Sequence, residues 1–198
     1  MSSQLTTVYL ARHGETAWTI SKQHTGRTDL PLTENGEKNA MKLKDRLAKI
    51  SFAKVFSSPL QRAKKTCDLA GYASTAIVDP DLYEWDYGDY EGKLTAEIRK
   101  DKADWDLFHD GVPHGESAAD VGKRADSAIA KIRSTPGNVL VFSSAHFLRV
   151  FAARWLGLPP TGGQYFVLGT ATLSILGYEH NNPKEPVVML WNDDRHIS

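Results

Sequence analysis

The sequence predicts an α/β fold with three layers, α/β/α, in which helices cover both faces of a mainly parallel central sheet. Apolar, β-branched runs alternate along the chain with segments whose apolar residues recur at helical spacing. One run, Val139–Phe142, is apolar without interruption, which is typical of a central parallel strand buried on both faces. The chain has 198 residues, of which 41% are hydrophobic and 24% charged. We therefore expect a single domain over residues 1–198.

Composition excludes several classes of protein. Lys plus Arg and Asp plus Glu both number 24, so the net charge is zero, which argues against a nucleic-acid-binding protein. The single cysteine, Cys67, excludes an intramolecular disulfide and a cysteine-rich metal site. Residues 1–7 lack the pattern of a signal peptide, and no stretch reaches the ~18 apolar residues of a membrane span. We expect no membrane partner and a cytoplasmic location.

The elements can be assigned in chain order. A first strand covers about residues 6–12, and a loop from Trp18 to Pro31 follows it. Thr33 is expected to cap a helix, because acidic residues occupy the next turn and apolar residues then recur on one face. The later elements are a strand around Val55–Phe56, a helix capped by Ser58, a strand at 76–78, a helix after Ser117 to about Ile132, the strand 139–142, a buried helix from Phe147 to Leu156, and strands at 171–178 and 187–191.

A long excursion lies between the strand at 76–78 and the helix that follows Ser117. It covers about residues 79–117 and is too long for a simple connection, so we expect it to form a lid over a site. Its stretch from Asp81 to Gly92 is acidic and aromatic without a regular period, which favours a loop. Glu84 stands there between Tyr83 and Trp85, and a desolvated carboxyl can stay protonated, as a general acid must.

Basic residues and histidines follow three of the predicted strands. Arg12 and His13 end the first strand, Arg62 falls in the first helical turn after the second, and His146 comes shortly after Val139–Phe142. Taken alone, each would fit an ordinary surface or turn position. In a parallel sheet, however, all of these strand ends meet at one edge, where ligands bind. The set indicates phosphoryl transfer without a metal or cofactor, in which arginines hold the phosphate and an imidazole attacks it.

These motifs resemble the histidine phosphatase superfamily, also called phosphoglycerate mutase-like, over about residues 7–192. Arg12-His13-Gly14-Glu15-Thr16 is similar to the signature whose histidine becomes phosphorylated, and residues 57–63 to the motif whose arginine, here Arg62, binds phosphate. The resemblance implies that Glu84 is the proton donor. Residues 87–92 and the loop 24–33, in which Gly26 is a candidate phosphate contact, look like the branch of sedoheptulose-bisphosphatase-like enzymes.

One motif departs from the family pattern. The second active-site histidine of the family usually stands in Ser-His-Gly, five residues before an arginine, and here that position holds Ser144. Either the turn is remodelled so that His146 reaches the phosphate, or Ser144 fills the position and donates only a hydroxyl hydrogen bond. We favour His146, because no other histidine nearby can supply the missing positive charge.

The resemblance implies a metal-independent phosphatase for small phosphate monoesters, with sugar phosphates as candidate substrates. His13 would attack phosphorus, Arg12, Arg62 and His146 would hold the phosphate, and Glu84 would protonate the leaving alcohol. Two alternatives stay open: a phosphoglycerate mutase-type phosphotransferase, and a binding protein for phosphorylated ligands that lost turnover. The acidic Asp86 after Glu84, where mutases are basic, favours the phosphatase. No motif in the sequence specifies the natural substrate. The oligomeric state stays open, with a homodimer as one candidate.

Overall fold

A six-stranded sheet organises the computed structural model, which describes residues 5–197. The strand order is β3-β2-β4-β1-β5-β6. The four strands β1 to β4 are parallel, whereas β5 and β6 run antiparallel at one side. The strands are β1 (Thr7–Arg12), β2 (Lys54–Ser57), β3 (Ala76–Val78), β4 (Asn138–Ser143), β5 (Leu173–Tyr178) and β6 (Pro186–Asp193).

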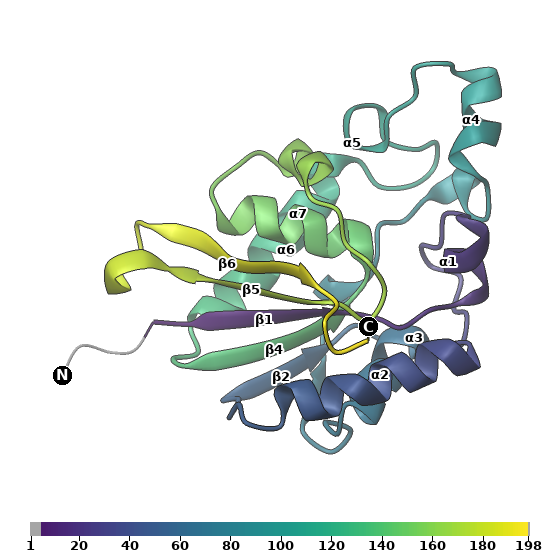
Figure 1. Cartoon of the computed structure of the whole chain (residues 1–198). Coiled ribbons are helices and arrows are strands. Elements are labelled where there is room, and N and C mark those ends of the chain that lie inside the picture. The colour runs from purple at the N-terminus through teal and green to yellow at the C-terminus, as the bar shows by residue number, and fades with distance from the viewer. Residues whose placement is uncertain (1–4, 198) are drawn as a thin grey trace.

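Helices cover both faces of this sheet, which confirms the predicted three-layer α/β class (Figure 1). One face carries α2 (Glu34–Leu47) and α3 (Gln61–Leu69), and the other carries α6 (Ala118–Arg133) and α7 (Ala145–Trp155). Each face has its own core. Leu43, Leu47 and Cys67 pack on the α2–α3 side, whereas Phe147 and Phe151 belong to the larger core under α6 and α7. Burial of these apolar faces is the main favourable term in the stability of the fold.

Two local assignments from the sequence need correction. The segment assigned to a loop contains a short helix, α1 (Ala17–Ser21), which Thr16 caps through its side chain and which ends at Lys22 with a positive φ. It was missed because it buries none of its residues and so has no apolar period. Ser58 does not cap the next helix. The N-cap of α3 is Leu60, and the Ser58 hydroxyl instead accepts a bond from the Leu60 N–H.

Other helix starts are as predicted. Thr33 caps α2 by accepting a bond from the Gly36 N–H, and Ser117 caps α6 in a reciprocal pair with Asp120. The first turn of α2 also packs directly against the backbone of the loop that follows β1. A Cβ on Gly14 would lie 2.5 Å from the Gly36 carbonyl oxygen, so this contact requires glycine at position 14.

The excursion between β3 and α6 projects beyond the sheet edge (Figure 1). It contains α4 (Thr95–Asp101), α5 (Leu107–Asp110) and the short 3-10 turns η1 (Pro80–Leu82) and η2 (Gly88–Tyr90). Three further elements complete the chain: α1, the turn η3 (Pro160–Tyr165) after α7, and the turn η4 (Glu179–Asn181) between β5 and β6. Within the described residues, no helix has the length and apolar character needed to cross a membrane. Residues 1–4, part of the stretch assessed for a signal peptide, lie outside the described residues.

Candidate active site

His13 lies at the carboxyl end of β1, between the ends of two neighbouring strands. Its backbone N–H donates to the Ser143 carbonyl at 2.9 Å, and its carbonyl accepts from the Ala171 N–H at 3.0 Å. The ring is 3% exposed, and its Nδ1 lies 2.7 Å from the Gly14 carbonyl oxygen. A carbonyl can only accept, so Nδ1 carries the proton. The lone pair of the ring is therefore on Nε2.

The surroundings of His13 keep its ring uncharged. Burial lowers the pKa of His13 well below its ordinary value, and the charges of Arg62 and Arg12 lower it further. A neutral imidazole is the nucleophilic form, because protonation occupies the lone pair that would attack. The structure thus supplies a nucleophilic nitrogen at the carboxyl edge of the sheet.

Two arginines flank His13, and each has a buried donor without an acceptor. Arg12 donates from Nη1 to the Leu168 carbonyl at 2.5 Å, and burial lowers its pKa to about 10. Arg62 is fully buried and donates to the carbonyls of Thr25, Gly26 and Thr28. The Nε atoms of both arginines lack a hydrogen-bond partner among the described residues. Buried donors of this kind are costly unless a ligand supplies acceptors, and an anion would do so.

Glu84 is brought to the same edge by the excursion and caps helix α7 from outside. It is 3% exposed, whereas the stretch around it taken alone would fit an exposed loop glutamate. Its carboxylate accepts from the backbone N–H groups of His146 at 3.1 Å and Phe147 at 2.7 Å, and also from its neighbour Trp85 at 2.8 Å. These bonds fix the carboxylate at the start of α7, on the wall of the cavity that contains His13.

Ser144 is the N-cap residue of α7, yet its hydroxyl does not cap the helix. Glu84 already takes the N–H groups that a capping serine normally binds. The Ser144 side chain is fully buried, and its Oγ has no hydrogen-bond partner in the described part of the chain. Since Ser143 pairs with Arg12 in the sheet, Ser144 follows β4 directly beside the Arg12–His13 turn.

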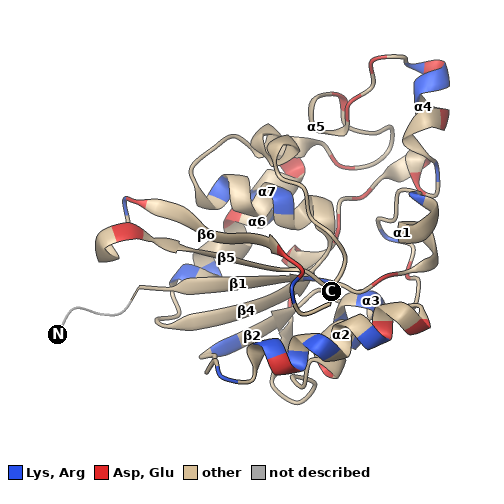
Figure 2. Cartoon of the chain, viewed as in Figure 1, with Lys and Arg blue, Asp and Glu red and all other residues tan. Residues whose placement is uncertain are grey.

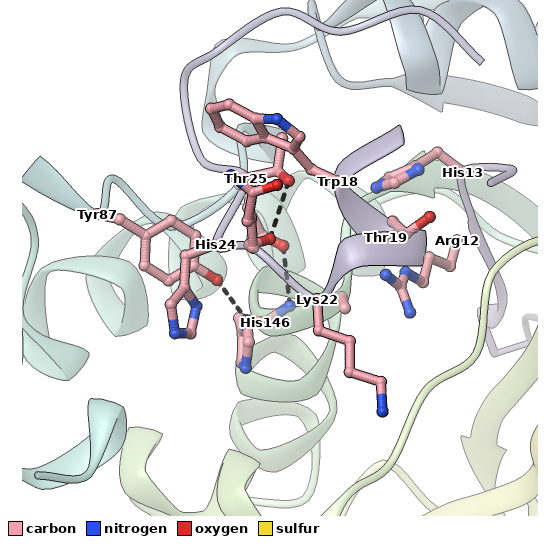
Figure 3. A pocket seen from close by; sticks show the side chains of 12 residues that line it. Arg12, His13, Trp18, Thr19, Lys22, His24, Thr25, Tyr87 and His146 are labelled. Carbon is pink, nitrogen blue, oxygen red and sulfur yellow. Dashed lines mark hydrogen bonds between the residues drawn. The ribbon is translucent and has the colours of Figure 1, made fainter. Parts of the chain in front are cut away.

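His146 lines the same cavity as His13, on its opposite side. Figure 3 shows His24, Tyr87 and His146 on one side and Arg12 and His13 on the other. Burial, and after it the charges of Arg149 and of other neighbours, lower the pKa of His146 well below its ordinary value. Its ring is therefore neutral, and it does not bring the positive charge that the sequence argument expected of it.

The hydroxyl of Tyr87 forms a hydrogen bond with His146. It lies 2.5 Å from Nδ1 of that ring, and burial raises the pKa of Tyr87 well above its ordinary value. The phenol therefore keeps its proton, and a neutral phenol can either donate to Nδ1 or accept from it, according to the tautomer of His146.

Gly26 does not face this cavity. Its N–H donates to Glu91 Oε1 at 2.8 Å, and its carbonyl accepts from Arg62. A Cβ there would lie 2.5 Å from the Trp85 carbonyl oxygen, so close packing requires glycine. The structure therefore brings Arg12, His13, Glu84 and His146 to one cavity and gives Gly26 a supporting position behind Arg62.

The cavity has a volume of about 170 Å³. Several of the residues that line it were not predicted from the sequence. Trp18, Thr19 and Lys22 come from α1 and its end, where the sequence predicted a loop. Lys22 is exposed and adds a cation at the rim (Figure 3). Lys22 stands in a segment without apolar period, so no pattern in the sequence could have assigned it to the site.

Potential metal ligands gather elsewhere among the described residues. Glu179, His180 and Glu185 have ligand atoms within 4.8 Å of one another on the turn between β5 and β6. They do not line the cavity, whose lining contains a single carboxylate, Glu84, beside the cations Arg12 and Lys22. This donor set favours an anion over a metal ion.

Comparisons with known proteins agree with this geometry. The sequence profile described as the histidine phosphatase superfamily (branch 1) matches residues 8–194. An acid phosphatase of Mycobacterium tuberculosis is 40% identical over 175 residues, covering 86% of each chain. The sedoheptulose 1,7-bisphosphatase of Saccharomyces cerevisiae is 36% identical over 181 residues, covering 75% of this chain and 67% of the yeast protein.

A solved structure shares the whole architecture. The Rv3214 protein of Mycobacterium tuberculosis superposes with a TM-score of 0.87 at 38% identity, covering 94% of this chain and 96% of that chain. The order of elements that positions the cavity is therefore shared with this relative.

Proposed function

Because this chain belongs to the histidine phosphatase superfamily, branch 1, we propose that it hydrolyses small phosphate monoesters through a phosphohistidine on His13. One observation carries the proposal. A neutral imidazole with its lone pair on Nε2 lies close enough to two arginines for their charges to lower its pKa, and the Nε donors of both arginines lack acceptors among the described residues. A phosphate monoester would supply those acceptors and present phosphorus to the nitrogen. Two relatives of this chain are an acid phosphatase and a sedoheptulose 1,7-bisphosphatase, which supports small phosphorylated molecules as its substrates.

The first step is attack on phosphorus. Nε2 of His13 forms a bond to phosphorus while the bond from phosphorus to the ester oxygen breaks. Arg12 and Arg62 hold the equatorial oxygens, and their charges stabilise the transition state. The hydroxyl of Ser144 donates a further hydrogen bond, since its own helix leaves it unpartnered. Glu84 acts here in its protonated form, which the dianionic substrate favours, and gives its proton to the leaving alcohol from the cavity wall.

The second step returns the enzyme to its starting state. Glu84, now ionised, takes a proton from water, whose oxygen attacks the phosphorus of phosphohistidine. The bond between phosphorus and Nε2 breaks, and inorganic phosphate leaves. His146 lines this cavity, and we place its proton on Nε2, from which it donates to the substrate as a neutral group.

The activity test uses para-nitrophenyl phosphate and a panel of sugar phosphates, with EDTA present. The wild-type protein is expected to release phosphate at an undiminished rate in EDTA, and His13→Ala is expected to release none. If wild type and His13→Ala are equally inactive on every substrate, the hydrolase proposal is wrong, and the phosphotransferase and the binding protein are the alternatives that remain. If wild-type activity vanishes in EDTA, the reaction needs a metal and the proposal is wrong.

Two substitutions separate the contributions of Ser144 and His146. Ser144→Ala removes one hydrogen bond to a charged phosphate, so kcat/KM should fall about tenfold. His146→Ala removes a neutral donor and should cost a similar or smaller factor. Steady-state kinetics with para-nitrophenyl phosphate measure both, and circular dichroism checks that each variant is folded. Unchanged turnover in His146→Ala excludes His146 from the mechanism, and unchanged turnover in Ser144→Ala excludes Ser144.

A further inference from the structure

The main chain that carries Glu84 is held by the side chain of Arg124, on α6. Residues 83–87 form neither helix nor strand, so no backbone ladder fixes them. Arg124 donates from Nη1 to the carbonyls of Asp81 at 2.8 Å and Tyr83 at 3.0 Å. Its Nη2 donates to the carbonyl of Glu84 itself at 3.4 Å. One guanidinium group thus binds three of the carbonyls that lead up to the proposed acid.

Glu116, at the end of the excursion, completes this arrangement. Its carboxylate accepts from Nε of Arg124 at 2.6 Å and from Nη2 at 2.7 Å, and it also accepts from the Asp86 N–H at 2.9 Å. Its carbonyl accepts from Nε1 of Trp85 at 2.8 Å, and its N–H donates to the Asp86 carbonyl at 3.0 Å. The chain is therefore held on both sides of Glu84.

The paired charges of Arg124 and Glu116 suit this position. Each side chain is 17% exposed, so water screens the pair only weakly. An unpaired guanidinium beside Glu84 would favour its ionised form, whereas a pair without net charge holds the segment and leaves proton donation possible. The carboxylate of Glu84 is itself bound only by neutral backbone N–H groups, such as those of His146 and Phe147.

We propose that Arg124, paired with Glu116, is a positioning residue for proton transfer from Glu84 to the leaving alcohol. The proposal rests on the function proposed above, in which Glu84 is the general acid. A general acid must lie within hydrogen-bond reach of the ester oxygen, and a displacement of about 1 Å can cost about a hundredfold in rate. Arg124 is not among the described residues that line the cavity, so it acts through the main chain of Glu84.

The test compares two substrates that need the acid to different extents. The para-nitrophenolate ion leaves as a stable anion, whereas the alkoxide of benzyl phosphate must be protonated as it leaves. In Glu84→Gln, kcat/KM should fall about a hundredfold more for benzyl phosphate than for para-nitrophenyl phosphate. Arg124→Met should show the same selective loss, at about tenfold. The ratio kcat/KM is compared because it covers the steps up to release of the alcohol.

Arg133→Met is the matched control, from the same helix. Arg133 donates to the Trp155 carbonyl at 2.9 Å and lies 4.5 Å from the Trp155 ring, so it holds α7 instead of the segment of Glu84. This variant should change kcat/KM for the two substrates by the same factor, whatever its Tm.

Glu116→Gln answers the same question if Arg124→Met does not fold. It keeps the size of the side chain but weakens the bonds to Arg124 and to the Asp86 N–H, so it should also lose more activity on benzyl phosphate. Equal factors for the two substrates in the Arg124 and Glu116 variants would overturn the proposal.

The two proposals fail in different ways. If Glu84→Gln is selective and Arg124→Met is not, the positioning role is wrong and the phosphatase stands. If Glu84→Gln also lacks selectivity, Glu84 is not the acid and the roles of both residues fall, whereas the phosphohistidine on His13 stands.

A wild-type protein that releases no phosphate would overturn the phosphatase, and hydrogen exchange then tests the positioning of Glu84 directly. Arg124→Met should speed exchange of the Phe147 N–H about tenfold relative to Arg133→Met, because Glu84 accepts from that group. Equal exchange rates in these two variants would show that Arg124 does not position Glu84.

Discussion

At the scale of single residues, the site depends on groups whose charges are set by burial. His13 is surrounded by two arginines and little water, so its proton affinity is low. Arg12 and Arg62 keep open donors, because the backbone carbonyls that hold them do not satisfy Nε. Ser144 keeps an open hydroxyl, because Glu84 performs its capping role. These groups are therefore preorganised to bind an anion.

The lowered pKa of His13 gives a direct prediction. An ordinary histidine protonates near pH 6.5, whereas His13 should remain neutral at pH values well below that. Nitrogen NMR of the labelled protein should show a neutral ring with the proton on Nδ1 at pH 6, titrating only in more acidic solution. A His13 ring that titrates near pH 6.5 would contradict this account of the nucleophile.

At the scale of elements, the loop after α1 holds Arg62 and is itself held by Glu91. The Glu91 carboxylate accepts from the N–H groups of Gly26 and Thr28 at 2.8 and 3.0 Å. The carbonyls of that loop accept from Arg62. Glu91 thus positions a phosphate-binding arginine without lining the cavity.

Removing Glu91 should therefore weaken catalysis at a distance. In Glu91→Ala the loop loses its carboxylate acceptor, so Arg62 is held less firmly and kcat/KM for para-nitrophenyl phosphate should fall about tenfold, with a raised KM. Asp89→Asn, an exposed change in the same turn, is the control and should match wild type. Steady-state kinetics measure the effect. Wild-type KM in Glu91→Ala would show that the loop keeps Arg62 in place by itself.

The sequence predicted the long, periodic elements well and the short ones poorly. Helices α2 and α6 and strands β1 and β4 have caps or apolar runs that local chemistry determines. The short helices α1, α4 and α5 carry no such period, because the longest of them has seven residues and apolar residues cannot recur at helical spacing over so short a segment. The same limit applies to the site. Arg12, His13 and Arg62 stand next to strands, whereas Lys22 and Tyr87 reach the cavity from irregular segments.

At the scale of the whole molecule, parallel strands carry distant segments of the chain to one edge. Arg12 and His13 follow β1, Arg62 follows β2, and Ser144 follows β4, while the excursion adds Glu84. Charged residues elsewhere spread over the outer surfaces of the helices, as on α2 (Figure 2). The net charge of the chain is therefore zero although cationic side chains cluster locally at the ends of the strands.

Burial of neutral histidines should make stability depend on pH. The pKa values of His13, His24 and His146 are all lowered in the folded state, whereas unfolded histidine has a pKa of about 6.5. Below about pH 6.5 the unfolded chain takes up protons that the folded chain refuses. The stability that these neutral histidines contribute is therefore complete above about pH 6.5. It is lost as the pH falls from there through the folded pKa values.

Denaturant titrations between pH 7 and pH 5 measure this dependence. In His24→Gln the slope of the free energy of unfolding against pH should decrease by up to about 1.4 kcal/mol per pH unit, because one fewer proton is taken up. The wild-type protein is the reference. Identical slopes in wild type and His24→Gln would mean that His24 protonates equally in the folded and unfolded states.

The central claim is that His13 carries the phosphoryl group during turnover. Rapid acid-free denaturation of the protein during reaction with para-nitrophenyl phosphate, followed by peptide mass spectrometry, tests it most directly. The account predicts one phosphoryl group on the peptide that contains His13, labile in acid, stable in base, and absent from His13→Ala. A wild-type protein that turns over rapidly without this modification, or that carries the group on Ser144, would contradict the account.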